Sequence, residues 1–324
     1  MPVMTYLEAI SLAMREEMRA DPSVFLIGED IGAYGGAFKV TKGLLEEFGA
    51  KRVIDTPIAE SMIAGVCIGA CHRGMRPVAE MQFADFITCA FNQIVTYASM
   101  NYYRVGVPLP MTVRLPYGGG LTAGPFHSKC PEAWFYHVPG LKLVAPSTPR
   151  DARALLKAAI RDPNPVLFFE HKYLYRRAKE EVPERDEEVP LGKGIVRREG
   201  RHVTVITYGA MVPASLEAAE AAARDGIETE VVDLRTLLPF DRPLLVESAK
   251  KTGKVLIVHE ATKTGGIGGD WAAVIAEEAF EHLDAPVRRL AALDTPVPFA
   301  PTLEKHYLPD AKKIEKAVRD LAAY

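Results

Sequence analysis

The feature that most constrains the fold of this chain is a regular alternation of short apolar runs and amphipathic helical patterns. In its first half, YLEAISLAMREEMRA at 6–20 has a helical apolar period, and SVFLIGED at 23–30 reads as a strand. Strand patterns recur in RPVAEMQF at 76–83 and PMTVRLP at 110–116, and ADFITCAFNQIVTYASMNYYRVG at 84–106 between them reads as one long helix. Strands that alternate with helices predict a mostly parallel sheet covered on both faces. The sequence therefore predicts an α/β fold.

A charged segment divides the chain. Residues 176–193, RRAKEEVPERDEEVPLGK, include eleven charged residues and two prolines among eighteen, without periodicity, which predicts a solvated connector. A chain of 324 residues ordinarily forms two domains. We therefore expect one domain over 1–175, the connector, and a smaller α/β domain over 194–324. Helices of the second domain are predicted to begin near Met211, Asp241 and Gly268.

Charge and apolar length exclude several classes of protein. The net charge of −3 gives no electrostatic reason to expect nucleic acid or an anionic membrane as a partner. No apolar run approaches the ~18 residues that span a bilayer. The first twenty residues form an amphipathic pattern rather than a signal peptide. We expect a cytoplasmic protein.

The cysteines do not form a metal-binding pattern. Cys67 and Cys71 lie four residues apart on one predicted helix face, but Cys89 and Cys130 stand alone. A zinc site would need a second closely spaced pair of ligands. We therefore expect the paired cysteines to be buried thiols that pack like small apolar side chains.

The glycine-rich segment KTGGIGGDWAAVIAEE at 263–278 follows a strand pattern and opens a helix. Its spacing differs from the GxGxxG of dinucleotide-binding folds, and the chain contains no GxxxxGK[ST]. Neither a dinucleotide site nor a phosphate-binding loop is supported. The glycines are predicted to permit close helix packing.

Glu60 stands in an almost wholly apolar run, DTPIAESMIAGVCIGAC at 55–71. Desolvation disfavours the charged form of a carboxyl group, and proteins seldom bury Glu without a partner. This placement indicates a functional carboxyl group. The alternative is a structural Glu at a helix N-terminus, where the helix dipole stabilises negative charge.

His127 ends a glycine-rich loop that follows a predicted strand, in RLPYGGGLTAGPFHSK at 114–129. Glycines let a backbone approach a ligand closely, and ligand crevices form at the carboxyl ends of parallel strands. A lone histidine is more often structural than catalytic, but this position favours a functional role.

Together these segments resemble one family from end to end: the β subunits of the thiamine-diphosphate-dependent first component of 2-oxo acid dehydrogenase complexes. The motifs that carry the resemblance are LIGEDIG at 26–32, DTPIAESMIAG at 55–65, RPVAEMQFADF at 76–86, GPFHSK at 124–129 and PEAWF at 131–135. The resemblance implies a transketolase-like pyrimidine-binding domain followed by a domain of the transketolase C-terminal type.

The resemblance also implies roles for single residues. Glu60 stands where the family places the carboxyl group that shares a proton with the cofactor's pyrimidine ring. Ile58 and Gln82 match positions that line the pyrimidine pocket. Phe86 matches a position that is Tyr in some relatives, so a hydrogen bond is lost there while ring stacking is kept. His127 matches the histidine that assists protonation and acyl transfer to lipoamide.

Metal ions and partners follow from the same resemblance. Thr112, Asp162 and Asn164 fall on positions of a monovalent cation site, which implies K⁺. The motif that holds Mg²⁺ and the diphosphate, GDG followed by NN, is missing, since the three asparagines are never adjacent. A separate α chain is therefore expected to supply it, in an α₂β₂ tetramer that serves a lipoyl acyltransferase core.

The substrate is expected to be a 2-oxo acid. RLPYGGG and EHKYLYR are more similar to branched-chain than to pyruvate β subunits, so branched-chain 2-oxo acids are preferred and pyruvate is the alternative. A rival of another class is a non-catalytic subunit that docks the α chain to the acyltransferase core. The presence of both Glu60 and His127 speaks against it, because a scaffold needs neither.

Overall fold

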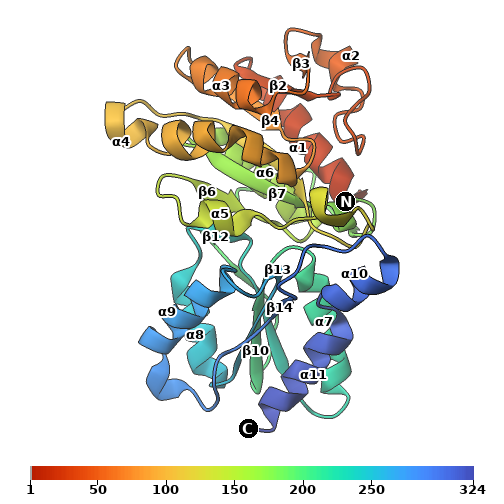
Figure 1. The fold of residues 1–324 in the computed structure, drawn as a ribbon, viewed down its shortest axis with the longest axis vertical. Coiled ribbons are helices and arrows are strands. Elements are labelled where there is room, and N and C mark those ends of the chain that lie inside the picture. Colours follow the sequence, from red (N-terminus) through yellow and green to blue (C-terminus); the bar gives the residue numbers. More distant parts are fainter. Residues whose placement is uncertain (1) are drawn as a thin grey trace. The chain divides into compact units, whose positions relative to one another are not determined.

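The computed structural model describes residues 2–324, which form two compact units. One unit contains the chain up to Tyr117 together with Trp134–Leu191, and the other contains Gly118–Ala133 and Gly192–Tyr324. Figure 1 shows the course of the chain. The sequence alone did not indicate that the loop 118–133 belongs with the later unit.

The first unit is built on a parallel sheet with the order β6-β7-β5-β4-β2-β3. The strands are β2 (Val24–Glu29), β3 (Val53–Thr56), β4 (Arg76–Glu80), β5 (Thr112–Tyr117), β6 (Lys142–Val144) and β7 (Val166–His171). Every residue of β2, β5 and β7 is buried, as expected of parallel strands covered on both faces.

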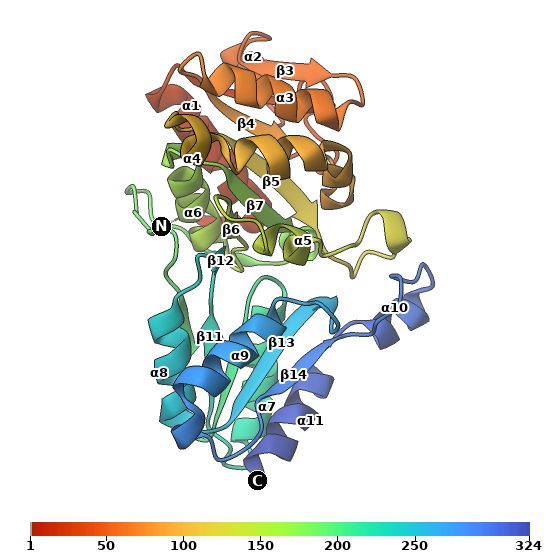
Figure 2. The ribbon, with the colours of Figure 1, turned by 60° about the vertical axis from the view of Figure 1, so that its left-hand side comes forward.

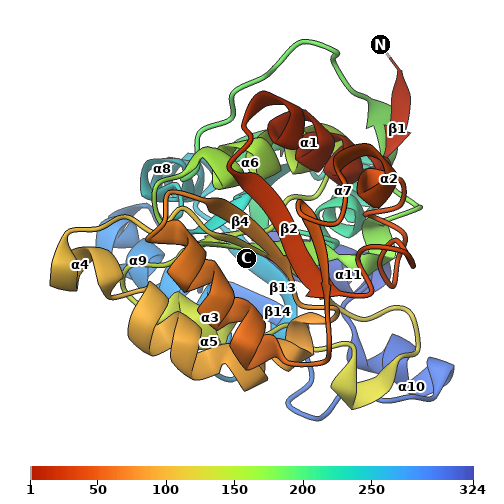
Figure 3. The same cartoon turned by 90° about the horizontal axis from the view of Figure 1, so that it is seen from above.

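Helices cover both faces of this sheet. Helix α1 (Tyr6–Ala20), whose start is capped reciprocally by Thr5 and Glu8, packs with α6 (Pro149–Arg161). Figure 3 shows these two helices on one side of β2 and β4, and α3 (Glu60–Cys71) on the other. The shorter helices are α2 (Leu44–Phe48), α4 (Asn101–Val105) and α5 (Glu132–Tyr136).

The segment from 84 to 105, which the sequence predicts as one long helix, is irregular. It consists of a 3₁₀-helix, Ala84–Ala90, a π-helix, Gln93–Ala98, and then α4. Many of its residues are aromatic or β-branched, and such side chains lose conformational freedom in a regular α-helix. The pattern predicted the helical character but not its interruptions.

Most of the charged segment 176–193 packs on the first unit. Residues Lys179–Glu181 form β8, which pairs antiparallel with β1 (Val3–Thr5). Beyond it, the Arg153 guanidinium donates to the carbonyls of Pro183 and Glu184.

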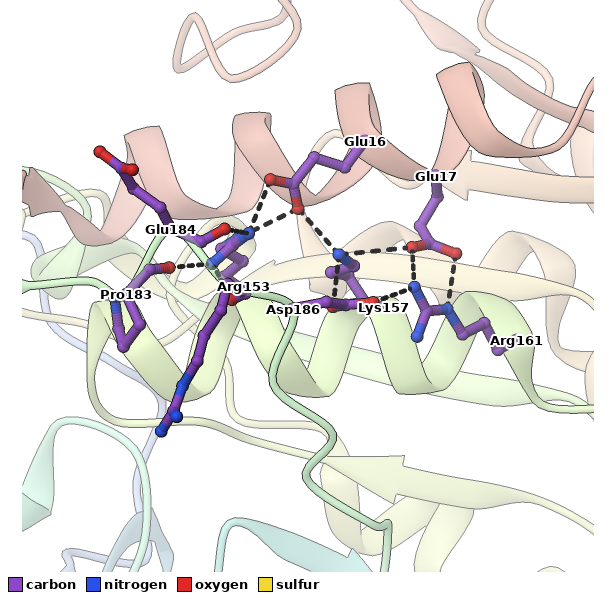
Figure 4. Close-up of polar contacts among 9 residues, drawn as sticks. Glu16, Glu17, Arg153, Lys157, Arg161, Pro183, Glu184 and Asp186 are labelled. Atoms are coloured by element: carbon purple, nitrogen blue, oxygen red, sulfur yellow. Dashed lines mark hydrogen bonds and ion pairs between the residues drawn. The ribbon is translucent and has the colours of Figure 1, made fainter. Parts of the chain in front are cut away.

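Asp186 ties this segment to α6 through ion pairs, as Figure 4 shows. Asp186 pairs with Lys157 at 2.6 Å and with Arg161 at 2.8 Å, and both cations also pair with carboxylates of α1. Composition therefore predicted the position of the segment between the two units but not its attachment to one of them.

The second unit has a sheet with the order β14-β13-β10-β11-β9, parallel except for the antiparallel edge strand β9. Its strands are β9 (Ile195–Arg198), β10 (Val203–Thr207), β11 (Thr229–Asp233), β13 (Val255–Thr262) and β14 (Arg288–Ala292), and the short β12 (Thr236–Leu238) follows β11. A mostly parallel sheet was predicted, and the structure confirms it.

Helices α7 (Met211–Ala223) and α11 (Ala311–Ala322) lie on one side of this sheet, and α8 (Arg242–Thr252) and α9 (Gly268–Glu278) lie on the other (Figure 2). The predicted starts near Met211, Asp241 and Gly268 are confirmed, and Asp241 caps α8. Helix α10 (Pro301–Tyr307) precedes α11.

The glycines before α9 make room for a buried histidine. A Cβ on Gly266 would lie 2.5 Å from Cε1 of His259, and one on Gly268 would lie 2.7 Å from its Cδ2. His259 is fully buried, and its Nδ1 lies 3.1 Å from the Ala261 carbonyl oxygen. The prediction that these glycines permit close packing is confirmed.

Two of the four thiols behave as predicted. Cys67 and Cys71 are buried, and burial raises the pKa of the Cys71 thiol to about 12. Cys89 is exposed and Cys130 is half-buried. Within residues 2–324, no three side chains of His, Cys, Asp or Glu form a metal-binding cluster, and no helix is long and apolar enough to cross a membrane.

A buried charge network links three neighbouring strands of the first unit, β4, β5 and β7. Arg114 of β5 donates to both oxygens of Glu170 in β7, at 2.6 and 2.8 Å, and pairs with Glu80 at the end of β4. Tyr175 donates to Glu170 at 2.7 Å. All four side chains are at most 5% exposed. Burial raises the pKa of Glu80 although Arg114 opposes the shift.

Replacement of Arg114 by Met should destabilise the protein strongly. The substitution leaves two carboxyl groups buried without their cation, which typically costs about 3–5 kcal/mol. Arg150→Met is the matched control, because Arg150 forms an ion pair with Glu187 but is half exposed, and such pairs contribute about 1 kcal/mol or less. Urea denaturation of both variants gives the free energies of unfolding. Equal losses would show that the Arg114 network has no special weight.

His259 should make the stability of the protein depend on pH. Burial lowers its pKa to about 4, from an ordinary value of 6.5. Between these values the unfolded chain binds a proton that the folded chain does not, so this contribution to stability falls as pH falls. Between pH 6.5 and 5 the loss is about 2 kcal/mol.

The variant His259→Gln cannot titrate, so its free energy of unfolding should fall less than that of the parent chain when the buffer changes from pH 7 to pH 5. His282→Gln, which alters an exposed imidazole, serves as the control. An identical pH dependence in the parent chain and His259→Gln would contradict the assignment.

Candidate active site

The carboxyl ends of three neighbouring strands bring polar side chains of the first unit to one edge of its sheet. Glu29 is the last residue of β2, Glu60 opens α3 shortly after β3, and Gln82 follows β4. Since β3, β2 and β4 are adjacent and parallel, these residues lie at the same edge. This is the edge at which ligands bind in open α/β sheets.

Glu60 is buried and has no hydrogen-bond partner for its side chain among the described residues. Its side chain is 7% exposed, and no hydrogen bond to its carboxyl group occurs within residues 2–324. Burial and, next, the charge of Glu60 raise the pKa of neighbouring Glu29, which accepts a hydrogen bond from the Ala59 N–H. A buried carboxyl group beside a second one, with its oxygens unused, is suited to share a proton with a ligand.

Phe86 is half-buried and is held by other rings. Its ring centroid lies 5.9 Å from that of Phe83 in an edge-to-face arrangement, and Phe83 packs in the same way on Phe38 at 5.5 Å. Phe38 in turn lies 5.3 Å from Tyr175 of the charge network. A chain of ring contacts therefore fixes the orientation of Phe86 relative to the end of the sheet.

Gln82 and Ile58, the other two residues predicted to line the pyrimidine pocket, differ in their surroundings. Gln82 is half-buried, and its Nε2 donates to Asp30 at 3.2 Å. Ile58 is 82% exposed. Ile58, Glu60, Gln82 and Phe86 thus lie in one region of the first unit. The Ile58 side chain is exposed on the surface of that region.

His127 belongs to the loop of the second unit and is half-buried. Its N–H donates to the Gly124 carbonyl at 3.4 Å, and the base of the loop is closed by a hydrogen bond from Gly118 to the Lys129 carbonyl at 3.2 Å. The first-unit residues and His127 are thus parts of separate units.

Sequence reasoning missed three acidic residues around this loop. Glu132, Glu260 and Glu304 are 1%, 6% and 3% exposed, and Glu260 and Glu304 accept hydrogen bonds from loop amides. Burial raises the pKa of Glu132 to about 7, although a hydrogen bond from Tyr208 opposes the shift. Glu132 lies within the family motif PEAWF, whereas no local pattern distinguished the other two.

The three predicted cation-site residues lie at the opposite end of the sheet. Thr112 begins β5 and pairs with Val166, while Asp162 and Asn164 precede β7. Asp162 already pairs with Lys142 and accepts the Asn164 N–H at 2.9 Å. The structure gathers these residues at one edge, but the carboxyl group among them is occupied by a lysine.

The comparisons with known proteins agree with this architecture. Residues 3–178 match the model of the transketolase pyrimidine binding domain, and 192–314 match the transketolase C-terminal domain. A solved structure of a split gene transketolase, described as an inactive beta4 tetramer, superposes with a TM-score of 0.78 at 26% identity and 99% coverage of both chains.

Curated relatives match over the full length of the chain. The 2-oxoisovalerate dehydrogenase subunit beta of Bacillus subtilis is 54% identical, with 100% of both chains covered. The pyruvate dehydrogenase E1 component subunit beta of Staphylococcus epidermidis is 44% identical, with 97% of both chains covered. Together with two transketolase-type domains in this order, these matches show that the chain belongs to the family of 2-oxo acid dehydrogenase β subunits.

Proposed function

We propose that this chain, together with an α subunit, catalyses the decarboxylation of branched-chain 2-oxo acids and transfers the acyl group to lipoamide. The observation that carries the proposal is the buried Glu60 carboxyl group, whose oxygens have no hydrogen-bond partner within residues 2–324. It stands in a chain 54% identical along its whole length to a 2-oxoisovalerate dehydrogenase β subunit.

The first-unit residues fit the pyrimidine half of thiamine diphosphate. When bound, this cofactor supplies the electron sink for breaking the bond to the carboxylate of the substrate. Glu60 would hold a proton at a pyrimidine nitrogen, and Phe86 and Ile58 would contact the faces of the ring. Gln82, already oriented by Asp30, would approach its polar edge.

His127 would act in acyl transfer. Imidazole ordinarily exchanges protons near neutral pH, and transfer to lipoamide requires a proton at the departing sulfur. Its place at the end of a glycine-rich loop supports this role, because such a loop can approach a ligand closely.

The remaining parts of the site are proposed to lie on partner chains. The sequence contains no GDG and no adjacent asparagines, so an α chain would bind Mg²⁺ and the diphosphate. We propose an α₂β₂ tetramer that delivers acyl groups to a lipoyl acyltransferase core. A K⁺ ion near Thr112, Asp162 and Asn164 would have to use backbone carbonyls, since Lys142 occupies the carboxyl group.

Pyruvate is the second candidate substrate, because pyruvate dehydrogenase β subunits are also similar over the full length, at up to 44% identity among those compared. The higher identity to the Bacillus branched-chain relative favours branched-chain acids. A purely scaffolding role is disfavoured by the buried Glu60, because docking requires no buried carboxyl group without a partner.

A reconstituted tetramer should prefer branched-chain substrates. The chain is combined with its α subunit, thiamine diphosphate and Mg²⁺, and consumption of 2-oxoisovalerate and pyruvate is compared using an artificial electron acceptor. We expect kcat/KM at least tenfold higher for 2-oxoisovalerate, since each extra buried methylene contributes about 1 kcal/mol or more. The chain without α should be inactive. Preference for pyruvate would overturn the substrate assignment, and inactivity of the tetramer with every 2-oxo acid would overturn the catalytic one.

Glu60→Gln should preserve assembly and impair activation of the cofactor. Glutamine retains the shape of the side chain but cannot share a carboxyl proton, so a general acid–base contribution of about 10²–10⁴-fold should be lost. Exchange of the thiamine C2 hydrogen, followed by NMR in the tetramer, measures this step. Glu46→Gln, which alters an exposed carboxylate of α2, is the control. Unchanged exchange in Glu60→Gln would leave Glu60 as a structural helix-terminal residue.

A further inference from the structure

We propose that Glu304 of α10 is a positioning residue that fixes the loop 118–133 and thereby orients His127. The proposal rests on the acyl-transfer role proposed above for His127. Glu304 lies far from the loop in sequence, yet both belong to the second unit. It is separated by 184 residues from Gly120, to which it is hydrogen-bonded.

Both oxygens of the Glu304 carboxyl group accept hydrogen bonds from backbone amides of the loop. Its Oε1 accepts the Gly120 N–H at 2.9 Å, and its Oε2 accepts the Thr122 N–H at 3.0 Å. The side chain is 3% exposed, so water competes little for these bonds. Hydrogen bonds to an ionised acceptor are roughly twice as strong as neutral ones. Both oxygens face amides of the loop, which identifies an anchor rather than an acid or base.

The glycines of the loop are explained by its close approach to the segment that carries Glu304. A Cβ on Gly119 would lie 3.2 Å from Oε1 of Glu304, and one on Gly124 would lie only 2.2 Å from the Phe299 ring just before α10. Gly120 and Gly124 also have positive φ angles of 82° and 68°. Larger residues at these positions would separate the loop from α10.

A second carboxyl group and a small apolar cluster support the anchor. Glu260 of β13 accepts the Gly119 N–H at 2.5 Å. At the other end of α10, Tyr307 packs with Ala292 and Val297 in the core of the unit. Helix α10 is thus packed on the core of the second unit, and its Glu304, together with Glu260, fixes the first half of the loop.

His127 lies only a few residues beyond the anchored part. Its N–H bonds to the carbonyl of Gly124, the glycine against Phe299, and the hydrogen bond from Gly118 to Lys129 closes the loop behind it. The backbone on both sides of His127 is therefore constrained. Loss of the Glu304 contacts should alter where its imidazole lies.

Two substitutions separate charge and shape. Glu304→Gln keeps the size of the side chain, but its amide NH₂ would face one of the two N–H donors and leave it unpaired. Glu304→Asp keeps both acceptor oxygens on a shorter side chain, so it should recover part of the function. The control is Glu315→Gln on α11, which removes a partly exposed carboxylate paired with Arg319.

Hydrogen–deuterium exchange of the full chain tests the anchor without reference to catalysis. In Glu304→Gln, amides of residues 118–124 should exchange about 10–100-fold faster than in the parent chain, because a charge-assisted hydrogen bond has been lost. Exchange in Glu315→Gln should be unchanged there. Unaltered protection of this segment in Glu304→Gln would overturn the proposal.

A double-mutant cycle in the tetramer tests whether Glu304 acts through His127. Glu304→Gln should slow reductive acylation of a free lipoyl domain about tenfold to a hundredfold, since small misplacements of a reacting group have effects of this size. Consumption of the 2-oxo acid with an artificial acceptor should change by less than about threefold, because that assay bypasses acyl transfer. In a His127→Ala background, Glu304→Gln should add no further loss.

An equal additional loss in the His127→Ala background would overturn the positioning role, because Glu304 would then act independently of His127. If His127→Ala itself left acylation unchanged, the proposed function of His127 would fail, and its positioning by Glu304 would fail with it. The exchange experiment would still decide separately whether Glu304 anchors the loop.

Discussion

The buried pairing of Arg114 with Glu80 and Glu170 is the interaction on which the first unit most depends. A guanidinium buried between two carboxylates is stable only while all its partners are present, since each isolated charge would carry a large desolvation cost. It joins three adjacent strands: Glu80 ends β4, Glu170 lies next to the end of β7, and Arg114 lies in the middle of β5. The polypeptide leaves these strands toward Gln82 and toward the loop of His127, so the geometry of the network sets where both segments begin.

Carboxyl groups have three different tasks in this protein, and their surroundings decide which. Glu170 is neutralised by a guanidinium and stabilises the fold. Glu304 accepts two backbone amides and is proposed to stabilise a loop. Glu60 is buried at the sheet edge without a hydrogen-bond partner in residues 2–324, and it is proposed to bind a ligand. Residue type and burial alone would not separate these roles, whereas the identity of the hydrogen-bond partner does.

The sequence predicted what depends on local pattern. Alternating apolar periods indicated the parallel sheets, and helix starts at Met211 and Gly268 follow from the same periods. The anomalous polarity of Glu60 required no structure to detect. Contacts between distant residues were not predictable in this way: Glu260 lies 141 residues from its partner Gly119, and no single-sequence signal joins them. For the same reason, composition does not reveal that Asp186 of the charged segment 176–193 pairs with Lys157 and Arg161 of α6.

Because residues 118–133 belong to the second unit, both units are discontinuous in sequence, and a single domain boundary does not describe them. The polypeptide leaves the first unit after Tyr117, folds with the second, and returns at Trp134 before it finally crosses over near Leu191. A gene cut within 176–193 would therefore yield an N-terminal fragment whose loop 118–133 lacks the carboxylates of Glu260 and Glu304, and a C-terminal fragment in which these carboxylates lack the loop amides that they bind. The two halves cannot be exchanged as independent modules between relatives, so α10 and the 118–133 segment should be inherited, and engineered, as one unit.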